Sequence, residues 1–143
     1  MKLLIDANVI LDILQERQPH YDDSLAVWEF CEQKFAEGFI SALTFANIMY
    51  VLRKDIDADD IARLFRMLKH VLSIAPLTEV EMRMAADMLW KDFEDALQAA
   101  TAHSVAADYI VTRNKQDFKD SSVPSITPKE FLQSVPSQIG RKK

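Results

Sequence analysis

The sequence predicts a single α/β domain, a parallel sheet of about five strands with helices on both faces. Short, continuously apolar segments alternate along the chain with segments whose apolar residues repeat at helical spacing, as in strands joined by helical crossovers. The strand segments are apolar throughout, as expected of strands covered on both faces. A length of 143 residues suits one core, and no stretch is long enough to be a linker.

Five segments have the length and composition of buried strands. We expect them at 2–6 (KLLID), 38–42 (GFISA), 71–75 (VLSIA), 108–112 (DYIVT) and, more weakly, 123–126 (VPSI). The domain is expected to cover 1–136, with a frayed tail over 137–143 that ends in Gly-Arg-Lys-Lys.

Helical periodicity and capping residues define the segments between these strands. Phe45, Ile48, Met49 and Leu52 fall on one helical face, and Thr78 with Glu81 forms a capping-box pattern. Thr127, Pro128 and Glu130 repeat that pattern before a short last helix. Before that last helix, we expect helices over 8–15, 21–36, 44–54, 79–90 and 93–106. A further helix is expected through 61–68, and the polar segment 55–60 can cap its start.

Composition narrows the possible functions. The single cysteine, Cys31, cannot form an internal disulfide, which suits a reducing cytoplasm. No signal-peptide pattern or membrane-spanning apolar run occurs, so we expect no membrane association. The net charge is −5, so nucleic-acid binding would need a bound metal or a local basic patch to offset repulsion.

Polar side chains gather where the predicted strands end, and ligands bind at this edge in open parallel sheets. Asp6 ends the first strand, Asn47 follows the second, and Thr112, Arg113, Asn114 and Asp117 follow the fourth; Asp92, Glu94 and Asp95 begin the helix that leads to the fourth. Several carboxylates at one edge repel each other unless a cation binds them, and oxygen ligands suit Mg²⁺ or Mn²⁺. The three histidines show no paired ligand spacing.

Each acid also has a purely structural interpretation. Asp6 and Asp92 could cap helices through their side chains. Glu94 and Asp95 could complement a helix dipole, and Asp117 could belong to a loop turn. Asp12 is either a solvated helix residue or the partner of a nearby base. The shared location of the acids at one sheet edge is what favours a functional site.

Four motifs, in this order, resemble the PIN domain family, which includes the VapC-type toxins of toxin–antitoxin pairs. They are LIDANVILDIL, ISALTFANIMYVLRK, DFEDALQAATA and ADYIVTRNKQDF, and the resemblance covers about residues 1–132. It implies a Rossmann-like PIN fold and a ribonuclease dependent on Mg²⁺ or Mn²⁺. Cytoplasmic location, an RNA substrate, a small antitoxin partner and a homodimer are the corresponding expectations.

By this resemblance, the metal ligands are Asp6, Asp95 and Asp117, and Asn114 completes the catalytic set. Thr112 and Arg113 match positions next to the scissile phosphate. If Asp6 binds a metal, Asn8 is expected to be a cap or a partner that orients Asp6. One match fails, because Asn47 occupies the position where the family usually has a glutamate. The subgroup with the DFEDAL motif, which this chain resembles, often lacks this glutamate.

Asn47 leaves two functions open. A neutral amide should bind a metal more weakly than a carboxylate, which still allows a nuclease. The alternative is a PIN-fold module that binds RNA or a protein without cutting. A phosphatase that uses an aspartyl phosphate on Asp6 is disfavoured, because it would want a second acid where Asn8 stands.

Overall fold

The computed structural model describes residues 1–135, so the expected tail 137–143 lies outside the described residues. Five parallel strands form one sheet in the order β3-β2-β1-β4-β5. Their bounds are β1 Lys2–Ile5, β2 Glu37–Ser41, β3 Leu72–Ala75, β4 Tyr109–Val111 and β5 Ser125–Ile126. The predicted fold class and all five predicted strands are confirmed, and β5 is the shortest.

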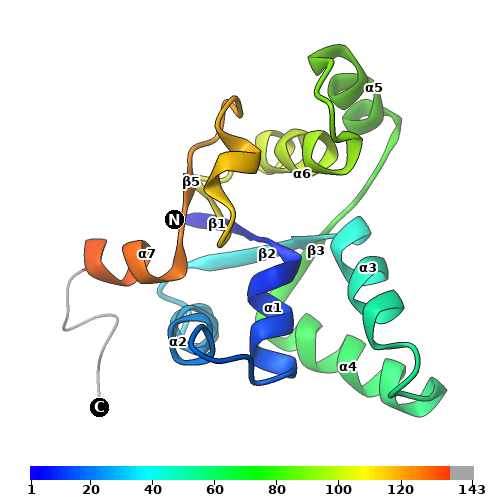
Figure 1. Cartoon of the computed structure of the whole chain (residues 1–143), viewed down its shortest axis with the longest axis vertical. Helices are drawn as coiled ribbons and strands as arrows, with labels where there is room; N and C mark the ends of the chain where they lie inside the picture. The colour runs from blue at the N-terminus through cyan, green and yellow to red at the C-terminus, as the bar shows by residue number, and fades with distance from the viewer. Residues whose placement is uncertain (136–143) are drawn as a thin grey trace.

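Helices cover both faces of the sheet (Figure 1). One face carries α1, α2, α3 and α4, with α7 packed on α2, and the opposite face carries α5 and α6. Their bounds are α1 Ala7–Leu14, α2 Tyr21–Glu32, α3 Ala42–Leu52, α4 Ala58–Val71, α5 Glu79–Met88, α6 Phe93–Ser104 and α7 Pro128–Ser134. None of the helices over residues 1–135 is long and apolar enough to span a bilayer.

Alternate residues of β1 point into different cores. Leu3 and Ile5 belong to the cluster under α1–α4, whereas Leu4 packs with Ala99 and Ala102 of α6 on the other face. The sheet is therefore buried on both sides, which explains why its strands are continuously apolar.

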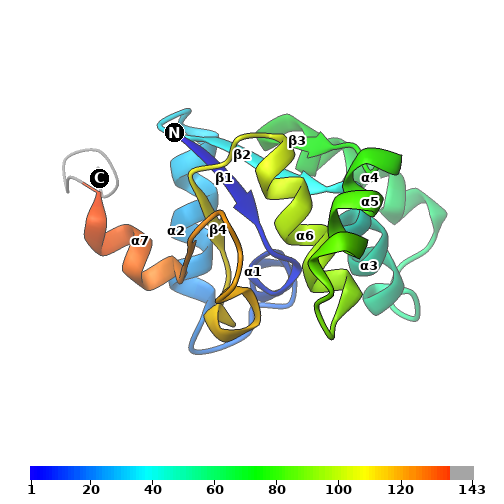
Figure 2. The same cartoon turned by 90° about the horizontal axis from the view of Figure 1, so that it is seen from above.

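The strand order places β1 and β4 on the two sides of the point where the chain reverses its winding. From β1 the chain steps outward to β2 and β3, and then crosses to β4 and β5 on the other side. A crevice at the carboxyl ends of such strands is the usual ligand site in open α/β sheets. Asp6 and Thr112 directly follow these two strands, and Figure 2 shows the strands from above.

Some expected helix boundaries were wrong, and one short helix was missed. The helix predicted over 21–36 ends at Glu32 because Lys34 turns left-handed (φ 66°) and the Phe35 N–H bonds the Phe30 carbonyl at 3.1 Å. The helix predicted from residue 44 begins at Ala42, where the Ser41 side chain caps it. A short 3₁₀ helix, η1 (Lys115–Phe118), was not expected.

Candidate metal and active site

Asp6 lies between β1 and α1 and caps α1. Its Oδ1 accepts a 2.8 Å hydrogen bond from the Ala7 N–H, which confirms the helix cap. Its Oδ2 accepts hydrogen bonds from the Thr112 hydroxyl at 2.8 Å and the Asn8 amide at 3.2 Å. Burial raises the pKa of Asp6 above its ordinary value; the bond from Thr112 opposes this, and the charge of Asp117 adds to it.

Thr112 connects the two strands at the switch point. It is fully buried, and besides donating to Asp6 its oxygen accepts the Asn114 backbone N–H at 3.0 Å. Asn8 reaches the same group, since its Nδ2 lies 3.4 Å from Thr112 Oγ1 and its Oδ1 accepts the Arg113 N–H at 3.3 Å. Asn8 and Thr112 thus hold the Asp6 carboxylate in one orientation, which is the role expected of Asn8. The side chain of Asn114, in contrast, is exposed.

Asp95 lies in the first turn of α6, close enough to other acids for their charges to affect it. Burial raises its pKa, and the charges of Asp92, Asp117, Asp6 and Glu94 raise it further, to about 6. Asp92 caps the helix, as expected, by accepting the Asp95 N–H at 3.1 Å. Carboxylates from three separate segments therefore act on one another here.

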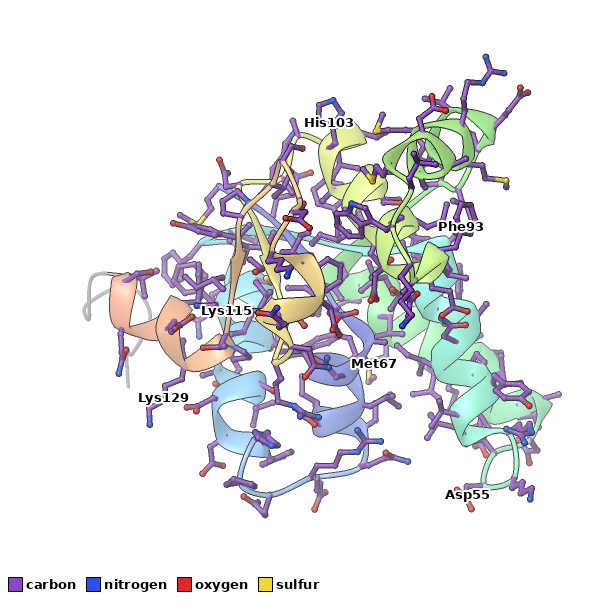
Figure 3. All side chains as sticks on the ribbon, turned by 45° about the horizontal axis from the view of Figure 1, so that its top comes forward. Asp55, Met67, Phe93, His103, Lys115 and Lys129 are labelled. Atoms are coloured by element: carbon purple, nitrogen blue, oxygen red, sulfur yellow. The ribbon has the colours of Figure 1, made fainter. Side chains whose placement is uncertain are left out.

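Asp95 and Asp117 line one polar cavity of about 590 Å³ between the start of α6 and η1. Lys91 and Lys119 line it too, so the cavity wall carries positively charged side chains as well as carboxylates. Figure 3 shows the two segments, with Phe93 marking the start of α6 and Lys115 the start of η1. The cavity opens the acidic edge to a ligand.

Asn47 faces α6. Its Nδ2 lies 3.5 Å from Glu94 Oε1, a long hydrogen bond between α3 and the first turn of α6. The position where the resemblance predicts a glutamate is therefore adjacent to a carboxylate that another helix supplies.

Arg113 forms an ion pair with Asp12 of α1. Its Nε and Nη2 bind Asp12 Oδ2 and Oδ1 at 2.8 and 3.1 Å. Asp12 is fully buried and also accepts the Ser24 hydroxyl at 3.2 Å. Of the two interpretations of Asp12, the solvated residue is wrong and the partner of a base is confirmed.

Sequence reasoning missed Gln98 and Ser41. Gln98 lies one turn after Asp95 in α6, and its Nε2 donates to Asp6 Oδ1 at 3.4 Å while its Oε1 accepts the Ser41 hydroxyl. Gln98 therefore connects, through hydrogen bonds, the residue that follows β1 with the last residue of β2. Its position three residues after an acid in an otherwise alanine-rich helix was the available signal.

The donor set suits a hydrated cation better than a closed protein cage. Within residues 1–135, no three His, Cys, Asp or Glu side chains already converge as metal ligands. Mg²⁺ keeps several waters and uses one or two carboxylates. The charge of Asp117 helps to raise the pKa of both Asp6 and Asp95. A cation at this edge would relieve that repulsion, so the residues present fit such an ion.

The fold and this acidic edge define a Rossmann-like α/β protein with a candidate oxygen-ligand metal site. The PIN domain family profile matches residues 2–116, which covers most of the chain. The chain belongs to the PIN domain family.

Similar proteins agree with this assignment. The chain is 28% identical over 138 residues to Ribonuclease VapC1 of Aquifex aeolicus (strain VF5), covering 92% of this chain and 94% of that protein. The crystal structure of FitAcB from Neisseria gonorrhoeae matches with a TM-score of 0.68 at 20% identity, covering 89% of this chain and 98% of that one.

A second solved structure is VapBC2 from Rickettsia felis bound to a DNA fragment from their promoter. It matches with a TM-score of 0.63 at 18% identity, covering 89% of this chain and 98% of that chain. At these identities, the two structural matches establish the shared fold alone.

Proposed function

We propose that this protein is a divalent-metal-dependent ribonuclease that hydrolyses RNA phosphodiester bonds, and that it is the toxin of a toxin–antitoxin pair. The observation that carries the proposal is that Asp95 and Asp117 line one polar cavity, while Gln98, one turn after Asp95, donates to Asp6 at the switch point of the sheet. Membership of the PIN family and the similarity to a protein named as a ribonuclease support it.

In this proposal Asp6, Asp95 and Asp117 hold Mg²⁺ or Mn²⁺. The bound ion would polarise the phosphate and lower the pKa of a water molecule. Thr112 and Asn8 hold Asp6 in position through the hydrogen bonds described above. Because these bonds come from groups whose backbone is already fixed, the carboxylate needs little reorganisation on binding.

The lysine side chains around the cavity would reduce the electrostatic repulsion between RNA and this acidic protein. Lys91 and Lys119 line the cavity with the acids, and each can contact a phosphate oxygen. Arg113 is held by Asp12, so its role is to fix the loop that carries Asn114 and Asp117. Asn114, exposed at the start of η1, is available to bind a phosphate or water.

Cleavage of a labelled single-stranded RNA tests the proposal. Wild type should cut in Mg²⁺ or Mn²⁺ and stop when the metal is chelated, and Asp6→Asn should lose nearly all activity. Glu29→Gln, which removes a charge from an exposed position on α2, is the control and should cut normally. Equal cutting by wild type and Asp6→Asn would refute the proposed site.

The second candidate function is a module that binds RNA without cutting it, and the neutral Asn47 side chain favours it. This function predicts RNA binding that does not depend on a divalent metal and that weakens when negative charge is added near the cavity. RNA binding in chelator with no cleavage at any Mn²⁺ concentration would favour this candidate.

A small antitoxin is the proposed protein partner. An apolar cavity of about 380 Å³ lies between α1, α2 and α4, lined by Ile13, Leu14, Trp28 and Met67 among others. It could take the apolar side chains of a partner segment. Co-purification with the product of a small neighbouring gene tests this proposal, and Leu14→Asp should abolish it.

We also propose a homodimer. The helix α4 leaves three large apolar side chains exposed, namely Ile61, Phe65 and Met67. Such a surface on a small domain commonly marks an interface. One chain has a mass of 16.4 kDa, and light scattering at micromolar concentration should give twice that mass.

A further inference from the structure

We propose that Trp90 stacks on one unpaired base of the RNA substrate beside the acidic edge, and that the substrate is therefore single-stranded RNA. The inference rests on the proposed ribonuclease function and names the form of RNA that this site would take. Trp90 is one of two tryptophans in the chain, and the proposed metal ligands do not include it.

Trp90 lies in the connection between α5 and α6 and belongs to the wall of the candidate active site. It lines the polar cavity of about 590 Å³ that Asp95 and Asp117 also line. Part of the residue packs against two apolar clusters, one with Ala99 and the other with Ala96, and the residue as a whole is half-buried. The core therefore holds the indole in place, and its accessible part faces a space of the size that small ligands fill.

Leu89 extends the apolar part of this wall. It lines the same cavity and is 88% exposed, so its side chain gains little from the fold. It ends α5 with a left-handed backbone (φ 59°), in which the Cβ atom crowds the following carbonyl. A flat apolar ligand such as a nucleobase would remove Leu89 and Trp90 from water on binding.

The other side chains of the cavity match the rest of a nucleotide. Lys91 and Lys119 line it and can bind phosphate oxygens, and the carboxylates of Asp95 and Asp117 are proposed metal ligands. Positive side chains that track the backbone, combined with an aromatic side chain for the base, are how proteins bind single strands. A protein partner could cover Trp90, but it would not account for the lysines and the proposed metal ligands in the same wall.

Stacking on a fixed indole requires a base whose face is free. In an RNA duplex the bases are paired and stacked on one another, whereas in single strands and loops they can turn out onto an aromatic side chain. The position of Trp90 in the cavity thus favours single-stranded RNA over duplex RNA.

A fluorescence titration with adenosine monophosphate in Mg²⁺ tests the stacking without cleavage, because this probe has no phosphodiester bond. The variant Trp28→Phe leaves Trp90 as the single tryptophan, and Trp28 lines a different cavity, between α1, α2 and α4. Adenosine monophosphate should quench the emission of Trp90. Ribose phosphate, which lacks the base, should not quench it.

Cleavage of labelled single-stranded RNA gives a second readout. Trp90→Leu should raise KM about 5–20-fold with little change in kcat, because leucine keeps the packing but loses the aromatic face. Trp90→Phe, which keeps an aromatic ring, should stay close to wild type. Phe35→Leu removes an exposed aromatic ring just before β2, at the opposite edge of the sheet, and is the matched control. A duplex of the same sequence should be cut poorly.

The outcomes separate this inference from the proposed function. If wild type cuts RNA but Trp90 is not quenched and Trp90→Leu cuts like the Phe35→Leu control, the ribonuclease stands and the stacking role is refuted. Duplex RNA cut as fast as single-stranded RNA would also refute it, as would quenching by a co-purified protein and not by the nucleotide. If no RNA is cut with any metal but adenosine monophosphate still quenches Trp90, the proposed function fails and the base-binding site remains.

Discussion

The guanidinium of Arg113 and the carboxylate of Asp12 form a two-pronged ion pair that joins the loop after β4 to α1. The Nε–Oδ2 and Nη2–Oδ1 distances are 2.8 and 3.1 Å, and Asp12 is fully buried. Planar pairs of this kind fix orientation as well as distance. The loop that follows Thr112 is therefore held to α1 next to Asp6.

Breaking this pair should destabilise the protein strongly. Asp12→Asn removes the charge that Arg113 needs, and loss of one partner of a buried pair costs about 3–5 kcal/mol. Since the Arg113 side chain is 26% exposed, we expect the lower end, about 3 kcal/mol. Urea unfolding followed by tryptophan fluorescence measures the difference. Glu29→Gln is the control, and a loss similar to that of the control would contradict the prediction.

Glu81 should stabilise the contact between α5 and α6 in a pH-dependent manner. It accepts the Thr78 hydroxyl at 2.6 Å and the Ser104 hydroxyl at 2.7 Å, and the bonds from Thr78 first, then Ser104, lower its pKa to about 2. A lowered pKa gives stability that is present above the unfolded value near 4.5 and is lost as pH falls towards 2.

Glu81→Gln should therefore lower the free energy of unfolding by about 2 kcal/mol at pH 7, as for hydrogen bonds to a charged group. The difference from wild type should shrink as the pH falls from 4.5 towards 2. Glu79→Gln is the matched control, because Glu79 is exposed in the same helical turn and, within residues 1–135, pairs only with Arg83. A pH-independent difference for Glu81→Gln would contradict this mechanism.

The fold was predictable because its signals are local. Each strand is a short apolar run, and the capping boxes at Thr78 and Thr127 were recognisable from residue types alone. The end of α2 was not predictable, because it depends on a left-handed backbone conformation at Lys34. Glycine or asparagine would have indicated such a conformation, but a lysine does not.

The candidate site was predictable only as a set of residues. The strand ends indicated a larger set of polar residues at one edge of the sheet, and the resemblance to the PIN family singled out Asp6, Asp95 and Asp117 among them. The buried Asp12–Arg113 pair and the bridge through Gln98 depend on side-chain directions in three dimensions. The contact between Asn47 and Glu94 joins residues 47 positions apart, which no local pattern encodes.

Removing Asp95 should stabilise the metal-free protein at neutral pH. Its folded pKa of about 6 is above the ordinary 3.8, so its contribution to stability is present below about pH 4 and is lost as pH rises through 6. Asp95→Asn should melt a few degrees higher than wild type at pH 7.5 in chelator, and the gain should disappear near pH 4.

Asp22→Asn is the matched control for this measurement. Asp22 is exposed in the first turn of α2 and favours that helix through its dipole, so its removal should lower the melting temperature slightly. Opposite signs for the two variants would identify repulsion at the site. A lower melting temperature for Asp95→Asn at pH 7.5 would contradict the prediction.

Thr112 should set the protonation of Asp6 and thereby the pH at which metal binds. The hydroxyl donates to Asp6 Oδ2 at 2.8 Å, and this bond opposes the rise in the Asp6 pKa that burial causes. Thr112→Val keeps the shape of the side chain but removes the donor, so the pKa of Asp6 should rise further. A carbon-13 NMR titration of the Asp6 carboxyl measures this directly.

Metal binding gives a second readout of the same effect. A carboxyl must lose its proton to become a ligand, so Thr112→Val should weaken Mn²⁺ binding more at pH 6 than at pH 8. Thr112→Ser restores the donor and should titrate and bind like wild type, which separates the hydrogen bond from packing. The Asn114 N–H also loses its acceptor in Thr112→Val, at a cost of about 1–3 kcal/mol, so urea unfolding must first establish that the variant is folded. An unchanged Asp6 titration in folded Thr112→Val would show that the hydroxyl does not control this carboxylate.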